Sequence, residues 1–579
     1  MATDKLIIYQ VLPRLFGNTN TTNLPWGTLA ENGSGTFADI NEAALAGMKA
    51  LGATHVWYTG LPEHATMTDY AADGIRPDDP AVVKGRAGSP YAIKDYYDVV
   101  PDFAQSVPNR MAEFEALVQR THVYGLKVIT DIVPNHVARQ YASDAKPDSD
   151  TTDLGEGDDI RLPFSPRNNF YYLPGTTFKA PFVPGSIDAQ TPLTNSAPPI
   201  YEAPARVTGS GSINEAPHID DWYETIKLNY GHNVFDGSLH THLDATPDHP
   251  DTWYKLRDIM LFWASKGVDG FRCDMAHLIP VAFWQWVTAE VRATYPATIF
   301  IAEIYDPGLY RSFIFDGGFD YLYDKVGLYD SLRRLIEGHG SCYDITNVWQ
   351  RESGDFAEHM LRFLETHDEQ RIASSFFAGD PLRAISAMVV TATLHTGPYL
   401  LYFGQEVGVR GEDAEGFSGH DGRTTIFDYW GITDWQGYLN HHRYDGAGLT
   451  EPQRQLRAIY EKLGAVVTAS SAIQTGAFYD LQWANQQTPG YNQHRVYSYL
   501  RYTDSERLLI VCNFDVTQAF TSTVYVPDHA FEQMGLSATA RYQLTDLFLS
   551  DDRAEGIGNQ GIAVVIPPMS ARIFRLNSL

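Results

Sequence analysis

The sequence predicts an α/β protein built on a closed (β/α)8 TIM barrel, with a subdomain inserted after the third strand and an all-β domain at the C-terminus. Three observations lead to this prediction. Strand and helix patterns alternate along most of the chain, this alternation is interrupted once and then resumes, and after the last helix only strand patterns follow. Alternating strands and helices are typical of parallel strands joined by crossover helices. Because eight strand–helix units can be counted, a closed barrel is favoured over an open doubly wound sheet.

The expected strands are short runs rich in β-branched and aromatic residues, and the expected helices carry apolar residues three and four positions apart. The strands cover residues 6–11, 55–58, 127–133, 270–273, 299–302, 319–323, 360–364 and 399–403. The helices cover residues 41–51, 111–125, 252–267, 281–295, 324–337 and 381–394, and a last one begins near Thr450. No glycine-rich phosphate loop follows the first strand, which disfavours a nucleotide-binding fold.

The interruption covers residues 138–228, which are rich in Pro, Gly, Ser and Asp. A structureless loop of that length is unusual in a compact domain, so we expect an inserted subdomain (domain B) over the mouth of the barrel. From residue 467 onward, short β runs alternate with turn residues, which predicts a β-sandwich. The expected domains are therefore the barrel in two parts, 1–137 and 229–466, the insertion 138–228, and the C-terminal domain 467–579.

The composition excludes several classes of partner. A formal net charge of -28 with no Lys/Arg block repels nucleic acid and anionic lipid, and no stretch is apolar enough to span a membrane. Three separated cysteines without CxxC spacing suggest neither a disulfide framework nor a cysteine zinc site. Together with an N-terminus that lacks a signal pattern, they favour a cytoplasmic protein, the alternative being a secreted or periplasmic one whose signal has been removed. We expect a monomer or a weak homo-oligomer.

Four acidic residues follow four of the expected strands. Asp131, Asp274, Glu303 and Asp368 end the third, fourth, fifth and seventh apolar runs. Reacting groups in barrels of this kind lie at the carboxyl ends of the strands, so these side chains should meet at one mouth. Arg272 is two residues before Asp274 and shares its face of the strand, where it would keep the carboxylate ionised. Each acid alone could be structural, and Asp131 is the strongest candidate for an architectural role, but four matching positions favour a shared site.

The motifs around these acids resemble those of the α-amylase family of glycoside hydrolases. DIVPNH (131–136), GFRCD (270–274), FIAE (300–303) and FLETHD (363–368) are similar to the four family signatures and occur in the same order. LYFGQEVG (401–408) resembles the strand-eight signature, and SPYAIKDYYDV (89–99) resembles the segment that supplies a sugar-stacking tyrosine. Six motifs in register extend over nearly the whole chain, which makes the resemblance specific.

The resemblance implies a retaining double-displacement mechanism, in which a nucleophile and an acid/base carboxyl lie about 5 to 5.5 Å apart. Asp274 matches the nucleophile, Glu303 the general acid/base, and Asp368 the third carboxylate, which binds sugar hydroxyls. A general acid must be protonated when substrate arrives, so the pKa of Glu303 is expected to be raised. The remaining matches are substrate-binding residues: Tyr91 as the stacking platform, His136 and His367 for hydroxyls, and Arg272 beside the nucleophile.

The sequence departs from the family pattern at two places. His277 and Leu278 stand where family members often have Lys-His, and Thr366 stands where an asparagine is usual. Asn135 matches a family calcium ligand, although the histidine position of the Lys-His pair is altered to Leu278. The chemistry requires no cofactor, and the resemblance allows calcium at Asn135, because a hard cation takes oxygen ligands.

Three functions are compatible with these residues and motifs. The favoured one is hydrolysis of α-1,4-glucosidic bonds in starch, glycogen or maltooligosaccharides. The second uses the same residues but passes the glycosyl group to a sugar, as a 4-α-glucanotransferase or a trehalose-forming isomerase does, since sequence does not reveal how well the site excludes water. The third is a glucan-binding protein without activity, which is disfavoured because Asp274, Glu303 and Asp368 are all present.

Overall fold

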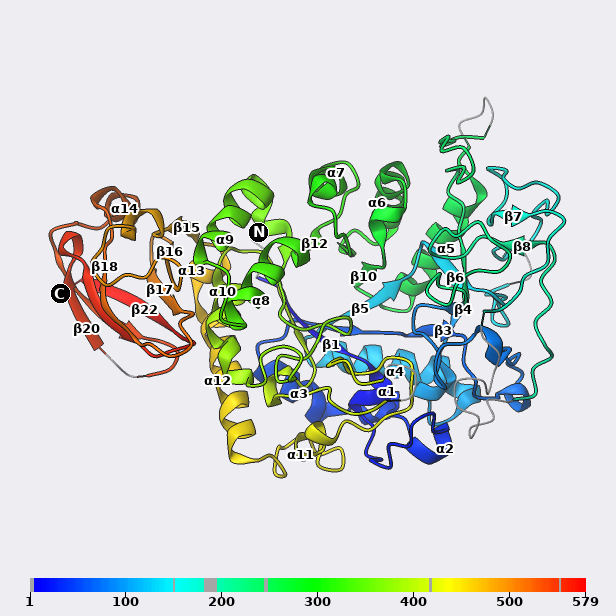
Figure 1. The fold of residues 1–579 in the computed structure, drawn as a ribbon, viewed down its shortest axis with the longest axis horizontal. Coiled ribbons are helices and arrows are strands. Elements are labelled where there is room, and N and C mark those ends of the chain that lie inside the picture. The colour runs from blue at the N-terminus through cyan, green and yellow to red at the C-terminus, as the bar shows by residue number, and fades with distance from the viewer. Residues whose placement is uncertain are drawn as a thin grey trace.

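The structure is a computed structural model, and it describes residues 5–148, 151–181, 195–243, 248–415, 419–550 and 553–578. Its centre is a barrel of eight parallel strands, with the C-terminal sheets on one side and the inserted segment on the other (Figure 1). Around the barrel the strand order is β13-β12-β11-β10-β5-β2-β1-β14, and a bridge between Arg362 and Tyr399 links the two end strands. The barrel predicted from sequence is therefore confirmed.

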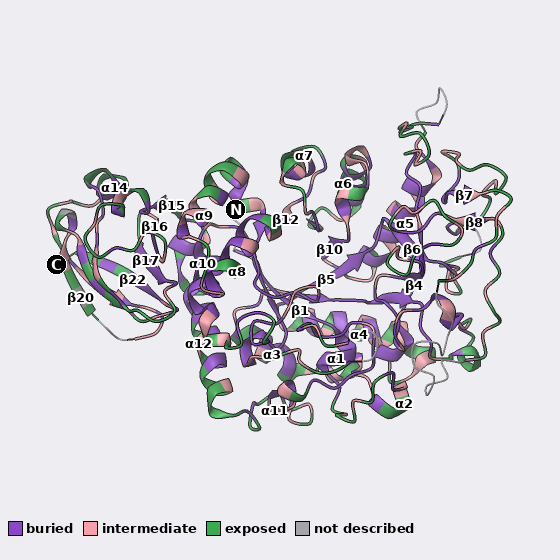
Figure 2. Cartoon of the chain, viewed as in Figure 1, coloured by how far each residue is buried: buried purple, intermediate pink, exposed green. Residues whose placement is uncertain are grey.

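The barrel strands are short and almost completely buried (Figure 2). Parallel strands that are covered on both faces read as nearly continuous apolar runs, which is how they were recognised in the sequence. Their bounds are β1 Ile7–Val11, β2 His55–Tyr58, β5 Lys127–Ile132, β10 Gly270–Cys273, β11 Ile299–Ala302, β12 Tyr321–Tyr323, β13 Met360–Leu361 and β14 Tyr399–Tyr402.

Helices alternate with these strands and cover the outside of the barrel. Most of them direct an apolar stripe toward the strands and a polar face outward, as expected for surface helices of a globular protein. The principal helices are α3 Glu42–Ala50, α4 Arg110–Val123, α5 Asp251–Ser265, α6 Val281–Thr294, α7 Tyr310–Phe315, α8 Asp330–Ile336, α10 Ile385–Thr393 and α12 Glu451–Ala469.

The seventh strand is shorter than the expected 360–364. β13 ends at Leu361, and only the bridge of Arg362 continues the pairing with the next strand. Beyond it, Glu365 accepts hydrogen bonds from the Ile372 amide (2.7 Å) and from Arg371 Nη1 (2.8 Å), so the chain turns out of the sheet. Asp368 therefore comes from the loop after β13, seven residues past the strand, whereas sequence placed it at the strand end.

The inserted segment contains little regular structure. Its two ends are joined where β6 (His136–Ala138) pairs antiparallel with β9 (Thr225–Lys227), and β7 (Tyr172–Leu173) pairs with β8 (Ala205–Arg206) further out. The β6–β9 register places His136 opposite Lys227. Because β6 follows β5 closely, the insertion begins and ends at the same mouth of the barrel at which the acidic residues were expected.

The C-terminal part forms two antiparallel sheets with their own apolar core. Helix α10 joins them to the barrel: Ser386 Oγ donates to the carbonyls of Asn513 (2.7 Å) and Ser570 (2.9 Å), and Thr393 Oγ1 lies 2.5 Å from the Tyr499 hydroxyl. The six-stranded sheet consists of β15 Ala477–Asp480, β16 Val496–Tyr502, β17 Arg507–Asn513, β22 Ser570–Ser578, β19 Arg541–Asp546 and β20 Arg553–Ile557, and the two-stranded sheet of β18 Phe520–Val524 and β21 Ile562–Ile566.

No helix in the described part of the chain is both long and apolar enough to cross a membrane.

Candidate active site

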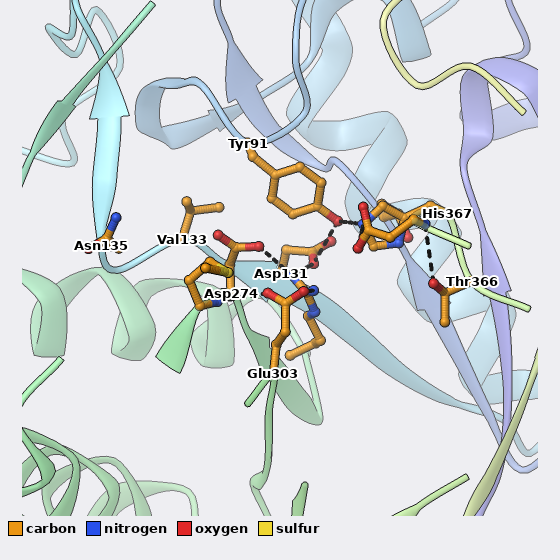
Figure 3. Close-up of polar contacts among 12 residues, drawn as sticks. Tyr91, Asp131, Val133, Asn135, Asp274, Glu303, Thr366 and His367 are labelled. Carbon is orange, nitrogen blue, oxygen red and sulfur yellow. Dashed lines mark hydrogen bonds and ion pairs between the residues drawn. The ribbon is translucent and has the colours of Figure 1, made fainter. Parts of the chain in front are cut away.

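The predicted site residues meet at the carboxyl ends of neighbouring strands. β10 lies between β5 and β11, so Arg272 is paired in register with Asp131 on one side and Ile301 on the other. Asp274 and Glu303 follow the ends of β10 and β11 and point toward one another in Figure 3. A cavity of about 380 Å³ receives all three predicted catalytic carboxylates, Asp274, Glu303 and Asp368, together with Tyr91, His136 and His367.

Arg272 connects the acidic residues. Its Nη1 donates to Asp274 Oδ1 at 2.7 Å and lies 3.5 Å from Asp131 Oδ1. Its Nη2 lies 2.9 Å from Glu303 Oε1, an ion-pair contact whose angles are not those of a hydrogen bond. The guanidinium is fully buried and lies 5.3 to 5.5 Å from the ring centres of Trp57, Tyr91 and Tyr323. This packing fixes the cation between the two carboxylates that the sequence assigns to the chemistry.

The directions in which the pKa values of Asp274 and Glu303 are shifted are the reverse of the expected ones. Burial and then the negative charge of Glu303 raise the pKa of Asp274 well above its usual value. Burial alone would also raise the pKa of Glu303, but Arg272, a hydrogen bond from Tyr305 and one from the Met275 amide together lower it. Of the two carboxyls, Asp274 therefore has the raised pKa and Glu303 the lowered one, whereas the resemblance predicted a raised pKa for Glu303.

Besides the charge of Arg272, two hydrogen-bond donors lower the pKa of Glu303. The Tyr305 hydroxyl donates to Oε1 at 2.5 Å, and the Met275 amide donates to Oε2 at 2.8 Å. Met275 has a φ of 44°, in the left-handed region that non-glycine residues rarely adopt, and this turn brings its N–H toward Glu303. Hydrogen bonds to the ionised form stabilise it. These two contacts therefore oppose protonation of Glu303.

Replacing Tyr305 by Phe is expected to move the alkaline limb of the pH–rate profile to higher pH. The change removes a donor to the Glu303 carboxylate, so the pKa of Glu303 rises. A general acid is lost as the pH rises through its pKa, so a higher pKa extends activity upward. The profile of kcat/KM against pH measures this. Tyr321→Phe, on the neighbouring strand β12, is the matched control, and a limb that does not move in Tyr305→Phe would contradict this account of Glu303.

Asp131 lies below the cavity and is fully buried. Its Oδ2 accepts from Trp57 Nε1 at 2.9 Å and from the Gly60 amide at 3.3 Å, and burial, opposed by Arg272, raises its pKa to about 6. These contacts tie the third strand to the second and to the loop after it. They fit the architectural role that the sequence favoured for this residue.

Tyr91 and His367 form a stacked pair at the cavity wall. Their ring centres are 5.2 Å apart at an angle of 22°, and the Tyr91 hydroxyl lies 2.5 Å from His367 Nε2 (Figure 3). Gln10 Nε2 lies 2.8 Å from the other ring nitrogen. Burial, and then the charge of Arg272, lowers the pKa of His367 to about 3, so the imidazole is neutral and hydrogen-bonds without adding positive charge. Tyr91 thereby presents a fixed ring to the cavity.

Asp368 reaches the cavity from the loop after β13. Its side chain is 41 % exposed, and burial of the rest together with the charge of Glu303 raises its pKa to about 7. The Thr366 hydroxyl accepts from the Asp368 amide at 3.2 Å, and Arg423 Nε donates to the Asp368 carbonyl at 2.7 Å. A threonine and a distant arginine thus hold this loop where the family pattern has an asparagine.

The described residues around Asn135 do not fit a calcium ion. Asn135 Oδ1, the atom that would bind the metal, accepts a hydrogen bond from the Lys227 ammonium, and Asn135 Nδ2 donates to the Gly209 carbonyl at 2.8 Å. Burial lowers the pKa of Lys227 to about 8, which still leaves it charged at neutral pH. Within the described ranges, no group of three or more His, Cys, Asp or Glu side chains could hold a metal. The Lys227 ammonium therefore binds the Asn135 oxygen that the resemblance implied as a calcium ligand.

The thermal stability of the protein is accordingly expected to be insensitive to calcium and to chelators. A metal that binds only the folded state raises Tm, so Tm in EDTA and in excess CaCl2 should agree when measured by calorimetry. Lys227→Met leaves the buried Asn135 oxygen without its donor, which costs about 1 to 3 kcal/mol, and calcium should not restore the lost stability. Lys179→Met, at an exposed lysine, is the control. A chelator-dependent fall in the Tm of the wild type would contradict the role given to Lys227.

Several residues that line the cavity were not identified from the sequence. Lys84, Trp222, Glu224, Met275 and Tyr305 all border it. The signal for Tyr305 was its position two residues after Glu303, but Lys84, Trp222 and Glu224 lie in irregular segments with no motif. His277 stands at one of the departures from the family pattern, and the centre of its ring lies 6.3 Å from that of the Tyr305 ring. The adjacent Leu278 is exposed.

Comparison with known proteins decides the family. The model described as "Alpha amylase, catalytic domain" matches residues 10–298, the stretch that carries Asp131, Arg272 and Asp274. The chain belongs to the α-amylase family. It is 35% identical over 173 residues to an α-1,4-glucan:maltose-1-phosphate maltosyltransferase of Cereibacter sphaeroides, and 23% identical over 339 residues to α-amylase 3 of Dictyoglomus thermophilum.

These two matches cover 29% and 55% of this chain, and only 25% and 54% of the two relatives. Among solved structures, the fold is shared with a maltogenic α-amylase of Thermotoga neapolitana (TM-score 0.62, 19% identity, 99% of each chain). It is also shared with an α-amylase of Geobacillus thermoleovorans (TM-score 0.62, 19% identity, 99% of this chain and 98% of that one). The family and fold are therefore established.

Proposed function

We propose that this α-amylase family protein is a glycoside hydrolase that cleaves α-1,4-glucosidic bonds by double displacement with retention of the anomeric configuration. One observation carries the proposal: the buried Arg272 contacts both Asp274 and Glu303, and these two carboxyls line the cavity that also receives Asp368. A nucleophile and an acid/base on opposite sides of one sugar ring are what such a reaction requires.

In the first step, an oxygen of Asp274 forms a bond to the anomeric carbon while the bond to the leaving sugar oxygen breaks. Asp274 Oδ1 accepts from Arg272, so Oδ2 is the oxygen left for attack. Glu303, once protonated, gives its proton to the leaving oxygen. In the second step, Glu303 takes a proton from water, the hydroxide oxygen bonds to the anomeric carbon, and Asp274 is released as a carboxylate.

The other cavity residues support binding of the sugar. Tyr91 offers its ring to the apolar face of a pyranose, as expected of aromatic side chains in sugar sites. Asp368 offers a partly exposed carboxylate, and the rings of His136 and His367 border the cavity. Burial lowers the pKa of both histidines to about 3, so neither competes with Arg272 for the negative charge of the carboxylates.

A time course of products from maltotriose and soluble starch tests this function. Hydrolysis gives only shorter sugars, with one reducing end per bond cleaved, and proton NMR at early times should show the α-anomer of the new reducing end. Oligomers longer than maltotriose, or trehalose, would instead indicate transfer to a sugar. The absence of any product from all α-glucans would reject the proposal.

A transferase is the second candidate, and the maltosyltransferase relatives are the observation that favours it. In that case the glycosyl group on Asp274 passes to the terminal hydroxyl of a glucan instead of to water. Incubation of α-maltose 1-phosphate with maltotetraose separates the two candidates. A transferase would release phosphate and lengthen the acceptor by one maltosyl unit, whereas a hydrolase would leave the acceptor no longer than before.

A further inference from the structure

The cavity is lined by residues that follow β10 and β11 and by residues of the loops after β2 and β14. A general acid protonates the leaving oxygen, so the leaving sugar lies beside Glu303, which follows β11. In the order of strands around the barrel, β1 is opposite β11, and β2 and β14 flank β1. The sugar that is transferred to Asp274 must therefore extend toward the loops after β2 and β14. In an α-1,4-glucan this is the direction of the non-reducing end.

These two loops are joined at that side of the cavity. The Ala87 amide donates to the Phe427 carbonyl at 3.0 Å, and the two loops contribute Ser89 and Phe427 to the cavity lining. The described part of the cavity is therefore bounded on the non-reducing side by backbone that is hydrogen-bonded between two loops. Its volume of about 380 Å³ is near the lower end of the range of about 300 to 1,000 Å³ that is usual for ligand pockets.

An ion pair connects this wall to the inserted segment. Lys84, from the loop after β2, places its Nζ 2.8 Å from Oε1 of Glu224, which lies just before β9. Their side chains are only 15% and 5% exposed, and both line the cavity. Lys84 Nζ also lies 5.9 Å from the centre of the Tyr223 ring. Because both side chains are largely buried and the ammonium lies beside an aromatic ring, separating the pair would leave a buried charge without its partner. Lys84 is therefore less mobile than an exposed lysine.

The third member of this barrier is Trp222. Its backbone is in the left-handed region with a φ of 49°, and its ring lies 5.3 Å from that of His136. The indole thus covers the cavity between the ion pair and the predicted sugar-binding histidine. We name Lys84, Trp222 and Glu224 the cross-loop barrier.

We propose that the cross-loop barrier closes the non-reducing side of the cavity, so that the protein acts at the non-reducing ends of α-glucans and transfers a short glycosyl unit to Asp274. The inference rests on the proposed function. Lys84 has three donors, of which one faces Glu224, and the others can donate to the hydroxyls of the terminal sugar. A chain that continued beyond this sugar would have to break a buried ion pair to pass.

The test compares maltoheptaose with maltoheptaose whose terminal 4- and 6-hydroxyls are tied in an acetal. The wild type should shorten the free sugar from its non-reducing end, with one product size at early times, and should cleave the blocked sugar at least about 100-fold more slowly. A site that hydrogen-bonds a hydroxyl rejects an analogue that lacks it by a factor of about 10⁴, so 100-fold is a modest threshold. Chromatography of the products measures both rates.

A double variant then tests the barrier itself. Lys84→Ala with Glu224→Ala removes both charges, since removing one would leave the other buried and unpaired. The rate on the blocked sugar divided by the rate on the free sugar should rise at least about tenfold above the wild-type ratio. Such a rise would mean that most of the expected 100-fold discrimination has been lost. Arg311→Ala with Asp355→Ala removes an ion pair that is 60% and 69% exposed on the protein surface, and this control should leave the ratio unchanged.

The outcomes separate this inference from the proposed function. Equal cleavage of free and blocked sugar by the wild type would overturn the inference and leave the proposed function intact. Cleavage of neither sugar, and of no other α-glucan, would reject both. Because the wild-type comparison alone can overturn the inference, the test remains decisive even if the double variant fails to fold.

Discussion

An Asp274→Ala variant should lose turnover by a factor on the order of 10⁴ or more, because it removes the atom that bonds to the anomeric carbon. The fold should survive the change, since Arg272 keeps its contacts with Glu303, Asp131 and the Tyr323 hydroxyl. Initial rates on maltotriose and the Tm of the purified variant measure the two effects separately.

Azide distinguishes loss of the nucleophile from general damage. With α-maltosyl fluoride as donor, azide should enter the space vacated by Asp274 and give the β-glycosyl azide, because it attacks from the side opposite the leaving fluoride. Asp274→Asn is the matched control: it can still accept the Arg272 hydrogen bond and should be equally inactive without damage to packing. Near-normal hydrolysis of natural glucans by either variant would reject the role of Asp274.

A Glu303→Gln variant should lose about 10²- to 10⁴-fold in kcat on maltotriose, the usual contribution of general acid–base catalysis. The expected loss is much smaller on α-maltosyl fluoride in the first step, because fluoride leaves without help from a strong acid. The amide cannot supply the proton, although it can still accept from the Met275 amide. The rates on the two substrates, measured side by side, give the ratio that identifies the acid.

The Glu303→Ala variant adds a check on the second step. Azide needs no general base, so it should attack the glycosyl-enzyme from the face that water normally uses and give the α-glycosyl azide. Opposite azide anomers from the Asp274 and Glu303 variants would assign the two roles independently. If Glu303→Gln lost the same factor on both substrates, the assignment of Glu303 as the acid would fail.

The residues of the site that stand directly at the ends of strands could be predicted from the sequence. Asp131, Asp274 and Glu303 belong to, or directly follow, buried apolar runs, and the parallel arrangement brings such ends to one edge. Asp368 was identified by its motif, but the length of its strand was wrong, because Glu365 and Arg371 turn the chain before it reaches the cavity. Local pattern locates buried strands well and loop geometry poorly.

The distribution of charge in the site was beyond sequence reasoning because it depends on contacts between distant segments. The pKa of Glu303 is lowered by Arg272, by the Tyr305 hydroxyl and by the Met275 amide, whose direction follows from a left-handed backbone turn. Asn135 and Lys227 are separated by the whole insertion and meet only because β6 pairs with β9. In the same way, Lys84 and Glu224 carry no motif that would reveal their pairing.

Helix α10 has a consequence for how the chain folds. All nine of its residues are buried, because the barrel covers one face and the C-terminal sheet the other, with Ser386 hydrogen-bonded to two of that sheet's strands. A helix that is buried on every side is stable only inside a protein. The barrel and the C-terminal sheets therefore fold as one cooperative unit. Deleting the sheets would expose a buried face of α10 to solvent and favour aggregation, so the barrel is not expected to be stable as a separate domain.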